Sequence, residues 1–387
     1  MPTLFDIENK MSPTEWVTDY KCILEKMHLI NPLQYAKTRN FINGAVTYLS
    51  PYISRGVISV QQVKEIVLNK GYKTYEIEKF LQELAWREYY QRVWQSKGHL
   101  IEQDLKQAQT DVSHFEMVAA LQNAATDIEA IDQSIQQLYT TGYMHNHCRM
   151  YVAALTCNIA KAYWLQPSRW MYYHLLDGDI ASNNCSWQWV AGAFASKKYY
   201  CNQENINKYT HSNQRNTFLD QSYEAISMMA VPDVLQGTSV LELTTQLPLT
   251  TVPFIDTDLP TLIYNGYNLD PLWRKDLPAN RVLLLEPSHF SKYPVSEKVI
   301  EFILKLALNI EGVQIYCGEI ADILDIYKGT LFNETNAIIS KEHPAFNHYP
   351  GIIDSRTWMY PEVTDYYPVH SCYENIGNGT YIGIDAE

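Results

Sequence analysis

Residues 175–192 read LLDGDIASNNCSWQWVAG, and this is the most informative stretch of the chain. The thirteen residues from 177 to 189 combine carboxylates, amides and two indoles, among them those of Asp177, Asp179, Asn183, Asn184, Trp187 and Trp189. Large apolar side chains clustered among acids reduce solubility unless a ligand covers them. We therefore interpret the stretch as the wall of a ligand site and not as an ordinary loop.

The segment upstream, HNHCRMYVAALTCNIAKAYW at 145–164, shows apolar residues at helical spacing and predicts a helix. Asn146 and Met150 are four residues apart, so they share one face, while His145 and Arg149 form a neighbouring row. Two polar groups beside a methionine suit the lining of a pocket. His145, His147 and Cys148 are too close in sequence for good tetrahedral ligation, so we expect no metal there.

Further upstream, a helix is predicted over 75–95, and another over 128–139. The first carries Glu83, Trp86, Arg87 and Tyr90 along one stripe. Charged residues beside an indole indicate the wall of a cavity, and a surface cation–π cluster is the alternative.

The earliest motif is GAVTYLSPYISRGVIS at 44–59, where hydroxyls alternate with glycine and proline. Hydroxyls and backbone N–H groups at a turn that enters a helix form an anion site suited to a diphosphate. An ordinary helix N-cap with turn residues explains the same pattern.

Together, four segments resemble the FAD-binding helical domain of the DNA photolyase and cryptochrome family: YAKTRNFINGAVTYLSPYISRGVIS, FLQELAWREYY, TGYMHNHCRMYVAAL and LLDGDIASNNCSWQW. The resemblance covers about residues 30–220 and implies a U-shaped FAD inside a mostly α-helical domain. It assigns cofactor contacts to Tyr35, Val46, Thr47, Tyr48, Leu49, Ser50, Phe80, Arg87, Arg149, Asp177, Asp179 and Asn183. In this assignment Arg149 pairs with Asp177, and Asn183 faces the flavin N5 atom.

The resemblance is nearest to cyclobutane pyrimidine dimer photolyases. It implies light-driven repair of damaged DNA by an electron from reduced flavin. The residues that would line the lesion cavity are Glu83, Trp86, Asn146, Met150 and Trp189. Enzymes for 6-4 photoproducts place histidines where this chain has Asn146 and Met150, so cyclobutane dimers are favoured. Catalytic roles would fall to Glu83, which stabilises the dimer radical anion, to Asn183, and to Trp164 and Trp187 as an electron relay.

Two local departures from the family stand out. His147 replaces an arginine that contacts the backbone beside the lesion, and a neutral imidazole would weaken that phosphate contact. Arg39, Arg87, Lys197, Lys198 and Gln214 remain candidates for DNA contact, with solvated surface side chains as the alternative. The third tryptophan of the usual relay, expected near Asp111, is missing. One of the 29 tyrosines would then be the terminal donor, or cellular reductants reduce the flavin.

After about residue 240 the pattern changes to short apolar runs, TLIYN, RVLLLE, VQIYC and AIIS, with a predicted helix over 296–310. This alternation predicts a smaller, Rossmann-like α/β domain with a parallel sheet. We expect a helical domain over 1–225 and an α/β domain over 240–387, with the boundary between 215 and 245. Members of the family carry an α/β antenna domain before the FAD-binding domain. The α/β domain of this chain is therefore either an antenna-like domain in reversed order or an interaction module. The sequence shows no recognisable motif for a second chromophore.

Charge divides the chain in the same way. Residues 1–215 hold 21 Lys and Arg against 20 Asp and Glu, whereas residues 216–387 hold 9 against 23. An acidic region repels a polyanion, so DNA should bind the N-terminal helical domain, and the acidic domain is free to bind a protein partner.

No apolar run is long enough to span a bilayer, and the N-terminus lacks the pattern of a secretory signal, so we expect a cytoplasmic protein with no membrane contact. The seven cysteines are scattered and form no C-x-x-C pair. Repair of DNA is the function expected first. A cryptochrome-like blue-light photoreceptor without repair is the alternative, and a flavin-free scaffold of the same fold ranks last.

Overall fold

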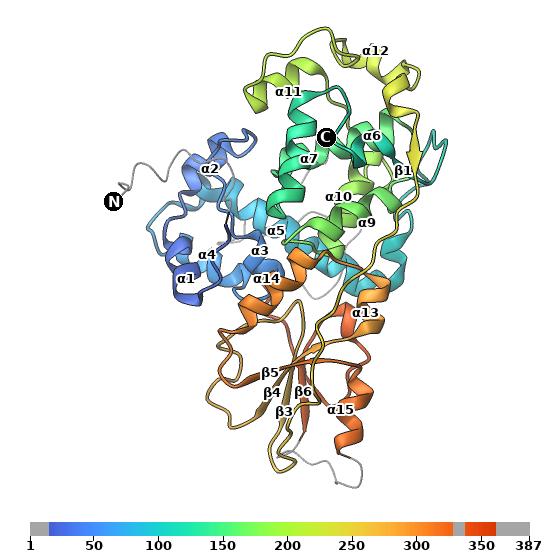
Figure 1. Cartoon of the computed structure of the whole chain (residues 1–387). Coiled ribbons are helices and arrows are strands. Elements are labelled where there is room, and N and C mark those ends of the chain that lie inside the picture. Colours follow the sequence, from blue (N-terminus) through green and yellow to red (C-terminus); the bar gives the residue numbers. More distant parts are fainter. Residues whose placement is uncertain (1–14, 328–336, 361–387) are drawn as a thin grey trace.

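The computed structural model describes residues 15–327 and 337–360, which form a helical part followed by an α/β part (Figure 1). The first half of the helical part contains α1 (Tyr20–His28), α2 (Pro32–Thr38), α3 (Ser50–Ser54), α4 (Val60–Leu68), α5 (Thr74–Lys97), η2 (Gly98–Glu102), β1 (Met117–Val118), α6 (Ala119–Gln122) and α7 (Glu129–Thr141). Its second half contains α8 (Asn146–Ala154), η3 (Leu155–Ile159), α9 (Leu165–His174), α10 (Ile180–Ala191), α11 (Gln203–Thr210), α12 (Tyr223–Met228), η4 (Asp233–Leu235) and β2 (Thr238–Ser239).

Several helices begin where the sequence supplies a capping side chain. Asp179 accepts a hydrogen bond from the Ser182 N–H at the start of α10, and Ser59 and Gln62 form a capping box at the start of α4. The expected helices over 75–95 and 128–139 are confirmed as α5 and α7.

The single helix expected over 145–164 is wrong in its second half. α8 ends at Ala154 and continues only as the π-helical turn η3, which ends at Ile159. Lys161 then takes a φ of 60°, a left-handed conformation that no α-helix contains. The chain therefore changes direction before α9, and the apolar periodicity that predicted one helix runs across this break.

The α/β part contains β3 (Thr261–Tyr264), β4 (Asn280–Leu285), α13 (Pro287–Lys292), α14 (Glu297–Ala307), β5 (Val313–Cys317), α15 (Ile320–Ile326), β6 (Ile338–Lys341), η5 (Pro344–Phe346) and β7 (Ile352–Asp354). Its sheet has the order β5-β4-β3-β6-β7, and every pairing is parallel. The four expected strands and the helix over 296–310 are thus confirmed, whereas β7 was not expected.

Alternate residues of β3, β4 and β6 enter different cores, as the two-residue period of a strand requires. Leu262 and Leu283 pack with Phe302 of α14 in a core that extends into the helical part as far as Phe80 of α5. Ile263 belongs to a second core on the other face. The sheet is covered on both faces, which is the usual condition for a parallel sheet.

Buried polar contacts join the two parts. The Arg55 side chain donates to the carbonyl oxygens of Leu176 (2.9 Å) and Gly266 (3.3 Å), and its own carbonyl accepts from the Leu269 N–H. Gly56, at φ 66°, lies so close that a Cβ there would be 2.3 Å from the Tyr267 carbonyl oxygen. The turn after β3 is therefore held against the turn after α3.

The helical part extends beyond the expected limit of residue 225. That residue lies inside α12, and β2 at 238–239 pairs antiparallel with β1 at 117–118. The chain then runs to β3 at residue 261 without a helix or strand. In residues 15–327 and 337–360, no helix is long and apolar enough to cross a membrane.

Candidate functional site

Asp177 is the centre of the first polar cluster, in the turn between α9 and α10. It is buried, and its carboxylate accepts hydrogen bonds from Arg149 Nη2 of α8 (3.0 and 2.9 Å) and from Ser50 Oγ of α3 (2.7 Å). Ser54 Oγ donates to the Asp177 carbonyl oxygen at 2.9 Å. The ion pair between Arg149 and Asp177 is therefore present, and together with the Ser50 hydrogen bond it joins three segments that are distant in sequence.

Asp179 forms a second cluster two residues later. Besides capping α10, its carboxylate accepts from Gln91 Nε2 and lies 3.5 Å from Arg87 Nη2, both on α5. Trp86 packs instead against the rings of Tyr89 and Tyr90, with centroids 5.8 Å apart in each pair. Arg87 therefore faces a buried carboxylate, while Glu83 and Trp86 of the same stripe are half-buried.

The turn before α3 has the backbone shape of an anion site. Tyr48 has a φ of 54°, which is rare outside glycine, and Leu49 after it is in the right-handed region. Successive residues of opposite hand direct their N–H groups into a common concavity that accepts anions. The Leu49 N–H lies 3.4 Å from Thr47 Oγ1, and the Tyr48 ring packs against Tyr143 at 5.4 Å.

A hydrophobic contact joins two other predicted cofactor residues. The ring of Tyr35 on α2 meets Phe80 on α5 edge to face, with centroids 5.0 Å apart. Burial raises the pKa of Tyr35 above its usual value, so the phenol stays protonated. Asn183 on α10 is also buried, and its Nδ2 donates to the Ser168 carbonyl oxygen at 2.9 Å.

The predicted lesion-binding residues lie on α5, α8 and α10, and α10 packs against both of the others. Glu83 Oε1 is held by Arg39 Nε at 3.2 Å and Lys79 Nζ at 3.1 Å. Asn146 is exposed at the first turn of α8, and Met150 one turn later is half-buried. Trp189 is half-buried on α10 and packs against Tyr199, with centroids 5.8 Å apart.

His147 lies between the rings of Tyr151 and Tyr209, with centroid distances of 4.9 and 4.6 Å. Burial lowers its pKa to about 4, and the charge of Arg39 contributes in the same direction. The imidazole is therefore neutral at neutral pH, as the sequence analysis assumed for its weakened phosphate contact.

The two relay tryptophans, Trp164 and Trp187, are both buried. Trp164 Nε1 donates to Asp104 Oδ1 at 2.7 Å, and the Tyr163 hydroxyl donates to the same oxygen at 3.0 Å. The Tyr163 and Trp164 rings have centroids 5.8 Å apart. Burial and the Asp104 carboxylate raise the pKa of Tyr163 to about 12.

Other DNA candidates have contacts of a different kind. Gln214 Nε2 donates to the Asp127 carbonyl oxygen at 2.8 Å, and its Oε1 accepts from the Glu129 N–H at the start of α7, so this side chain fixes the end of a helix. Lys198 Nζ binds Asp111 at 2.9 Å, while Lys197 is exposed. The structure brings none of these three to the clusters around Asp177 and Asp179, and their contact with DNA stays a prediction.

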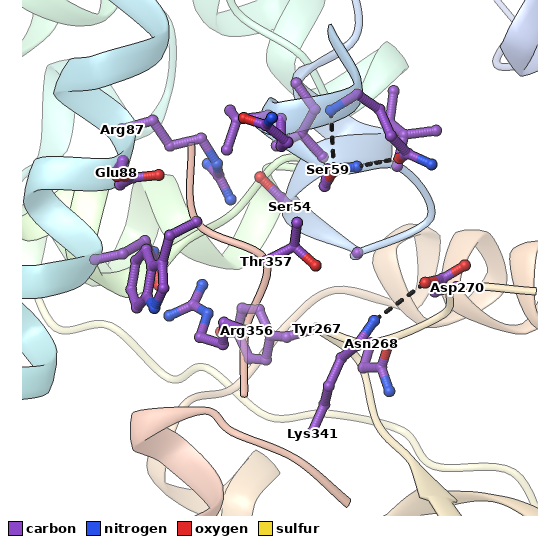
Figure 2. A pocket seen from close by; sticks show the side chains of 18 of the residues that line it. Ser54, Ser59, Arg87, Glu88, Tyr267, Asn268, Asp270, Lys341, Arg356 and Thr357 are labelled. Atoms are coloured by element: carbon purple, nitrogen blue, oxygen red, sulfur yellow. Dashed lines mark hydrogen bonds and ion pairs between the residues drawn. The ribbon is translucent and has the colours of Figure 1, made fainter. Parts of the chain in front are cut away.

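A cavity of about 290 Å³ lies between the helical part and the carboxyl ends of β3 and β6 (Figure 2). Arg87 and Asp179 line it, but Asp177, Arg149 and Ser50 do not. The other labelled lining residues are Ser54, Ser59, Glu88, Tyr267, Asn268, Asp270, Lys341, Arg356 and Thr357.

Residues 80–221 match the family model described as the FAD binding domain of DNA photolyase. Over these residues the chain is similar to that domain. A deoxyribodipyrimidine photo-lyase of Alkalihalophilus pseudofirmus is 31% identical over 167 residues, which cover 41% of this chain and 34% of that protein. One of Vibrio cholerae is 28% identical over 203 residues, covering 47% and 41%. The matched region thus spans well under half the length of these relatives.

Among solved structures, a cryptochrome of Synechocystis sp. PCC6803 matches with 21% identity and a TM-score of 0.44, covering 49% of this chain and 43% of that one.

The helical part also contains contact residues that the sequence analysis did not identify. Gln91 lies four residues after Arg87 on α5, so an extension of the stripe by one turn would have included it. Asp104 and Tyr163 belong to irregular segments, where no periodicity indicates which side chains meet.

Proposed function

We propose that this protein binds FAD in its helical part and uses it for light-driven repair of cyclobutane pyrimidine dimers in DNA. The observation that carries the proposal is the meeting of Arg149, Ser50 and Asp177, inside and beside the segment that matches the FAD-binding model. A buried carboxylate with both a guanidinium and a hydroxyl partner is a rigid, preorganised group for a polar cofactor.

The residues present fit FAD. The turn from Val46 to Ser50 offers its concave backbone and the Thr47 hydroxyl to the diphosphate, while the Ser50 hydroxyl donates to Asp177. The Asn183 amide nitrogen is already bound to the Ser168 carbonyl, which fixes the orientation of the amide and leaves its oxygen as the acceptor for a flavin N5–H. When bound, reduced and illuminated, FAD supplies the electron that opens the cyclobutane ring.

The lesion would be bound by α5, α8 and α10. A base leaves the duplex at a cost of a few kcal/mol, least where pairing is already damaged. Stacking on Trp86 and Trp189 recovers about 1–3 kcal/mol per base. Asn146 is exposed for a hydrogen bond to a pyrimidine edge, and Arg39 and Lys79 fix the Glu83 carboxylate for the same purpose.

The test is repair itself. FAD-loaded, reduced protein is mixed with an oligonucleotide that contains one thymine dimer, illuminated with blue light, and followed by the return of thymine absorbance. We expect recovery in the wild type and a loss of at least tenfold in rate for Trp86→Ala and Glu83→Ala. Glu78→Ala is the matched control, because Glu78 lies on the same helix and its carboxylate is bound only to the Gln82 side chain in the described contacts. Absence of repair by protein that binds reducible FAD would refute the proposal.

The alternative is a cryptochrome-like photoreceptor without repair. The neutral His147 favours it, since one cationic contact to DNA is lost, and the acidic C-terminal region offers a surface that repels DNA. In the same assay this alternative predicts photoreducible FAD, no repair, and no preference for the damaged oligonucleotide over the undamaged one.

A further inference from the structure

A segment after β7 returns from the α/β part to the helical part. It comprises residues 355–360, which contain no helix or strand and which we call the latch segment. Arg356, Thr357 and Trp358 of this segment line the cavity between the two parts. Figure 2 shows the first two of these close to the labelled residues of α5.

Side chains of the helical part fasten the backbone of the latch segment. The N–H groups of Met359 and Tyr360 both donate to the carboxylate of Glu88 on α5, the second at 3.1 Å. Arg92 Nη2 donates to the Tyr360 carbonyl oxygen at 2.8 Å, and Lys64 Nζ of α4 donates to the Met359 carbonyl oxygen at 2.9 Å. Hydrogen bonds with an ionised donor or acceptor are stronger than neutral ones, so these few contacts hold the segment firmly.

The same two cations also hold the rings of the latch segment. The Arg92 guanidinium lies 4.2 Å from the centroid of the Trp358 ring, and Lys64 Nζ lies 4.4 Å from that of Tyr360. Met359 and Tyr360 are buried in the core that joins the two parts. These two residues are therefore the anchor of the segment, whereas the three residues before them line the cavity.

Residues of the proposed flavin site line the same cavity. They are Arg87 and Asp179, both of which the family resemblance assigns to FAD. Burial lowers the pKa of Arg356 to about 10 and the Asp179 carboxylate opposes this shift, so the guanidinium of the latch segment is charged at neutral pH and attracted to that site. A volume of about 290 Å³ is at the lower end of small-molecule sites, and FAD is larger than most ligands of such sites. FAD could therefore pass on this side only if the latch segment moved.

We propose that the latch segment closes the flavin site on the side of the α/β part, and that FAD enters and leaves when Glu88 releases it. Segments that close over a site commonly set the rate at which a bound group is released. Both N–H donors of the anchor bind one carboxylate, so its loss frees Met359 and Tyr360 together. The proposal rests on the binding of FAD proposed above, but it applies to a photoreceptor as well as to a repair enzyme.

The experiment follows the exchange of FAD in darkness. The full chain is loaded with radiolabelled FAD and mixed with excess unlabelled FAD, and the retained label is measured after desalting. The rate of association is measured separately, with protein from which FAD has been removed.

Glu88→Gln is the main variant, because it keeps the shape of the side chain but removes the charge and one of the two acceptor oxygens. Losing one hydrogen bond to a charged group changes an equilibrium by about tenfold or more, so we expect FAD to leave at least tenfold faster. Association should quicken by a similar factor, since a gate changes both rates. Damage to the binding site itself would change release alone.

Lys64→Met tests the same segment even if Glu88→Gln fails to fold. It removes the contacts with Met359 and Tyr360 from a half-buried side chain, and it should speed release and association by about threefold. Glu286→Gln is the matched control, because Glu286 is equally buried and accepts a hydrogen bond from a backbone N–H but does not line the cavity. Its rates should equal those of the wild type.

Hydrogen exchange at the N–H groups of Met359 and Tyr360 reports separately whether the latch segment opens, and it should be faster in Glu88→Gln than in the wild type. Unchanged hydrogen exchange, unchanged FAD rates, or faster release with unchanged association would overturn the proposal. Wild-type protein that retains no FAD would refute the proposed function as well, so the two failures are distinguishable.

Discussion

Replacing Asp177 with asparagine tests the centre of the proposed flavin site. The substitution keeps the shape of the side chain and removes its charge, which leaves Arg149 without its partner and weakens the hydrogen bond from Ser50. Removing one member of a fully buried ion pair costs about 3–5 kcal/mol. Asp177 is 6% exposed but Arg149 is 21% exposed, so water partly compensates the guanidinium, and we expect a loss of about 2–3 kcal/mol.

A matched pair of variants separates this effect from a general loss of charge. Asp354→Asn breaks a similar contact with Arg274 in the α/β part, where the two side chains are 25% and 36% exposed, and should cost about 1 kcal/mol or less. Ser50→Ala removes one hydrogen bond to a charged group and should cost about 1.5–3 kcal/mol.

The assay is the free energy of unfolding from urea titration followed by circular dichroism, with the FAD content of each purified variant measured by absorbance. Asp177→Asn should lose both stability and FAD, whereas Asp354→Asn should keep its FAD. The reasoning fails if Asp177→Asn is no less stable than Asp354→Asn, or if it retains a full complement of FAD.

Three further predictions concern electron supply, DNA contact and pH. Tyr163→Phe keeps the ring but removes the hydroxyl that donates to Asp104. Flash absorption should show photoreduction of bound FAD at least tenfold slower, whereas repair by chemically reduced protein should be unchanged. Equal photoreduction rates in the variant and the wild type would exclude Tyr163 as terminal donor. His147→Arg should tighten DNA binding at low salt and steepen the dependence of log K on log salt by about 1; an unchanged slope would mean that this position does not reach a phosphate. Burial lowers the pKa values of His145 and His343 in the folded protein, so between about pH 6.5 and about pH 5 these histidines take up protons only in the unfolded chain. The free energy of unfolding should therefore fall by about 1.4 kcal/mol per pH unit for each of the two histidines as the pH is lowered. His343→Asn should make the urea-derived pH profile shallower by one such increment, and a flat wild-type profile would contradict both assignments.

The sequence predicted the α/β sheet well because its central strands are buried on both faces, so each reads as a continuous apolar run. β7 was missed since it is a three-residue edge strand whose two isoleucines are exposed. The break after η3 was missed for another reason. Apolar residues continue at helical spacing through Ala160, and the change of direction depends on the backbone conformation of Lys161, which no pattern of hydrophobicity contains.

The candidate site shows the same division. Spacing along one helix placed Glu83, Trp86 and Arg87 on a common stripe, and this could be read from the sequence. The contact of Ser50 with Asp177 joins residues 127 positions apart. The resemblance assigned both residues to the cofactor but did not predict that they meet. The side-chain amide of Asn268, which has no hydrogen-bond partner among the described residues, could not be predicted from the sequence. It is a polar group that is buried without a partner only when the two parts pack together.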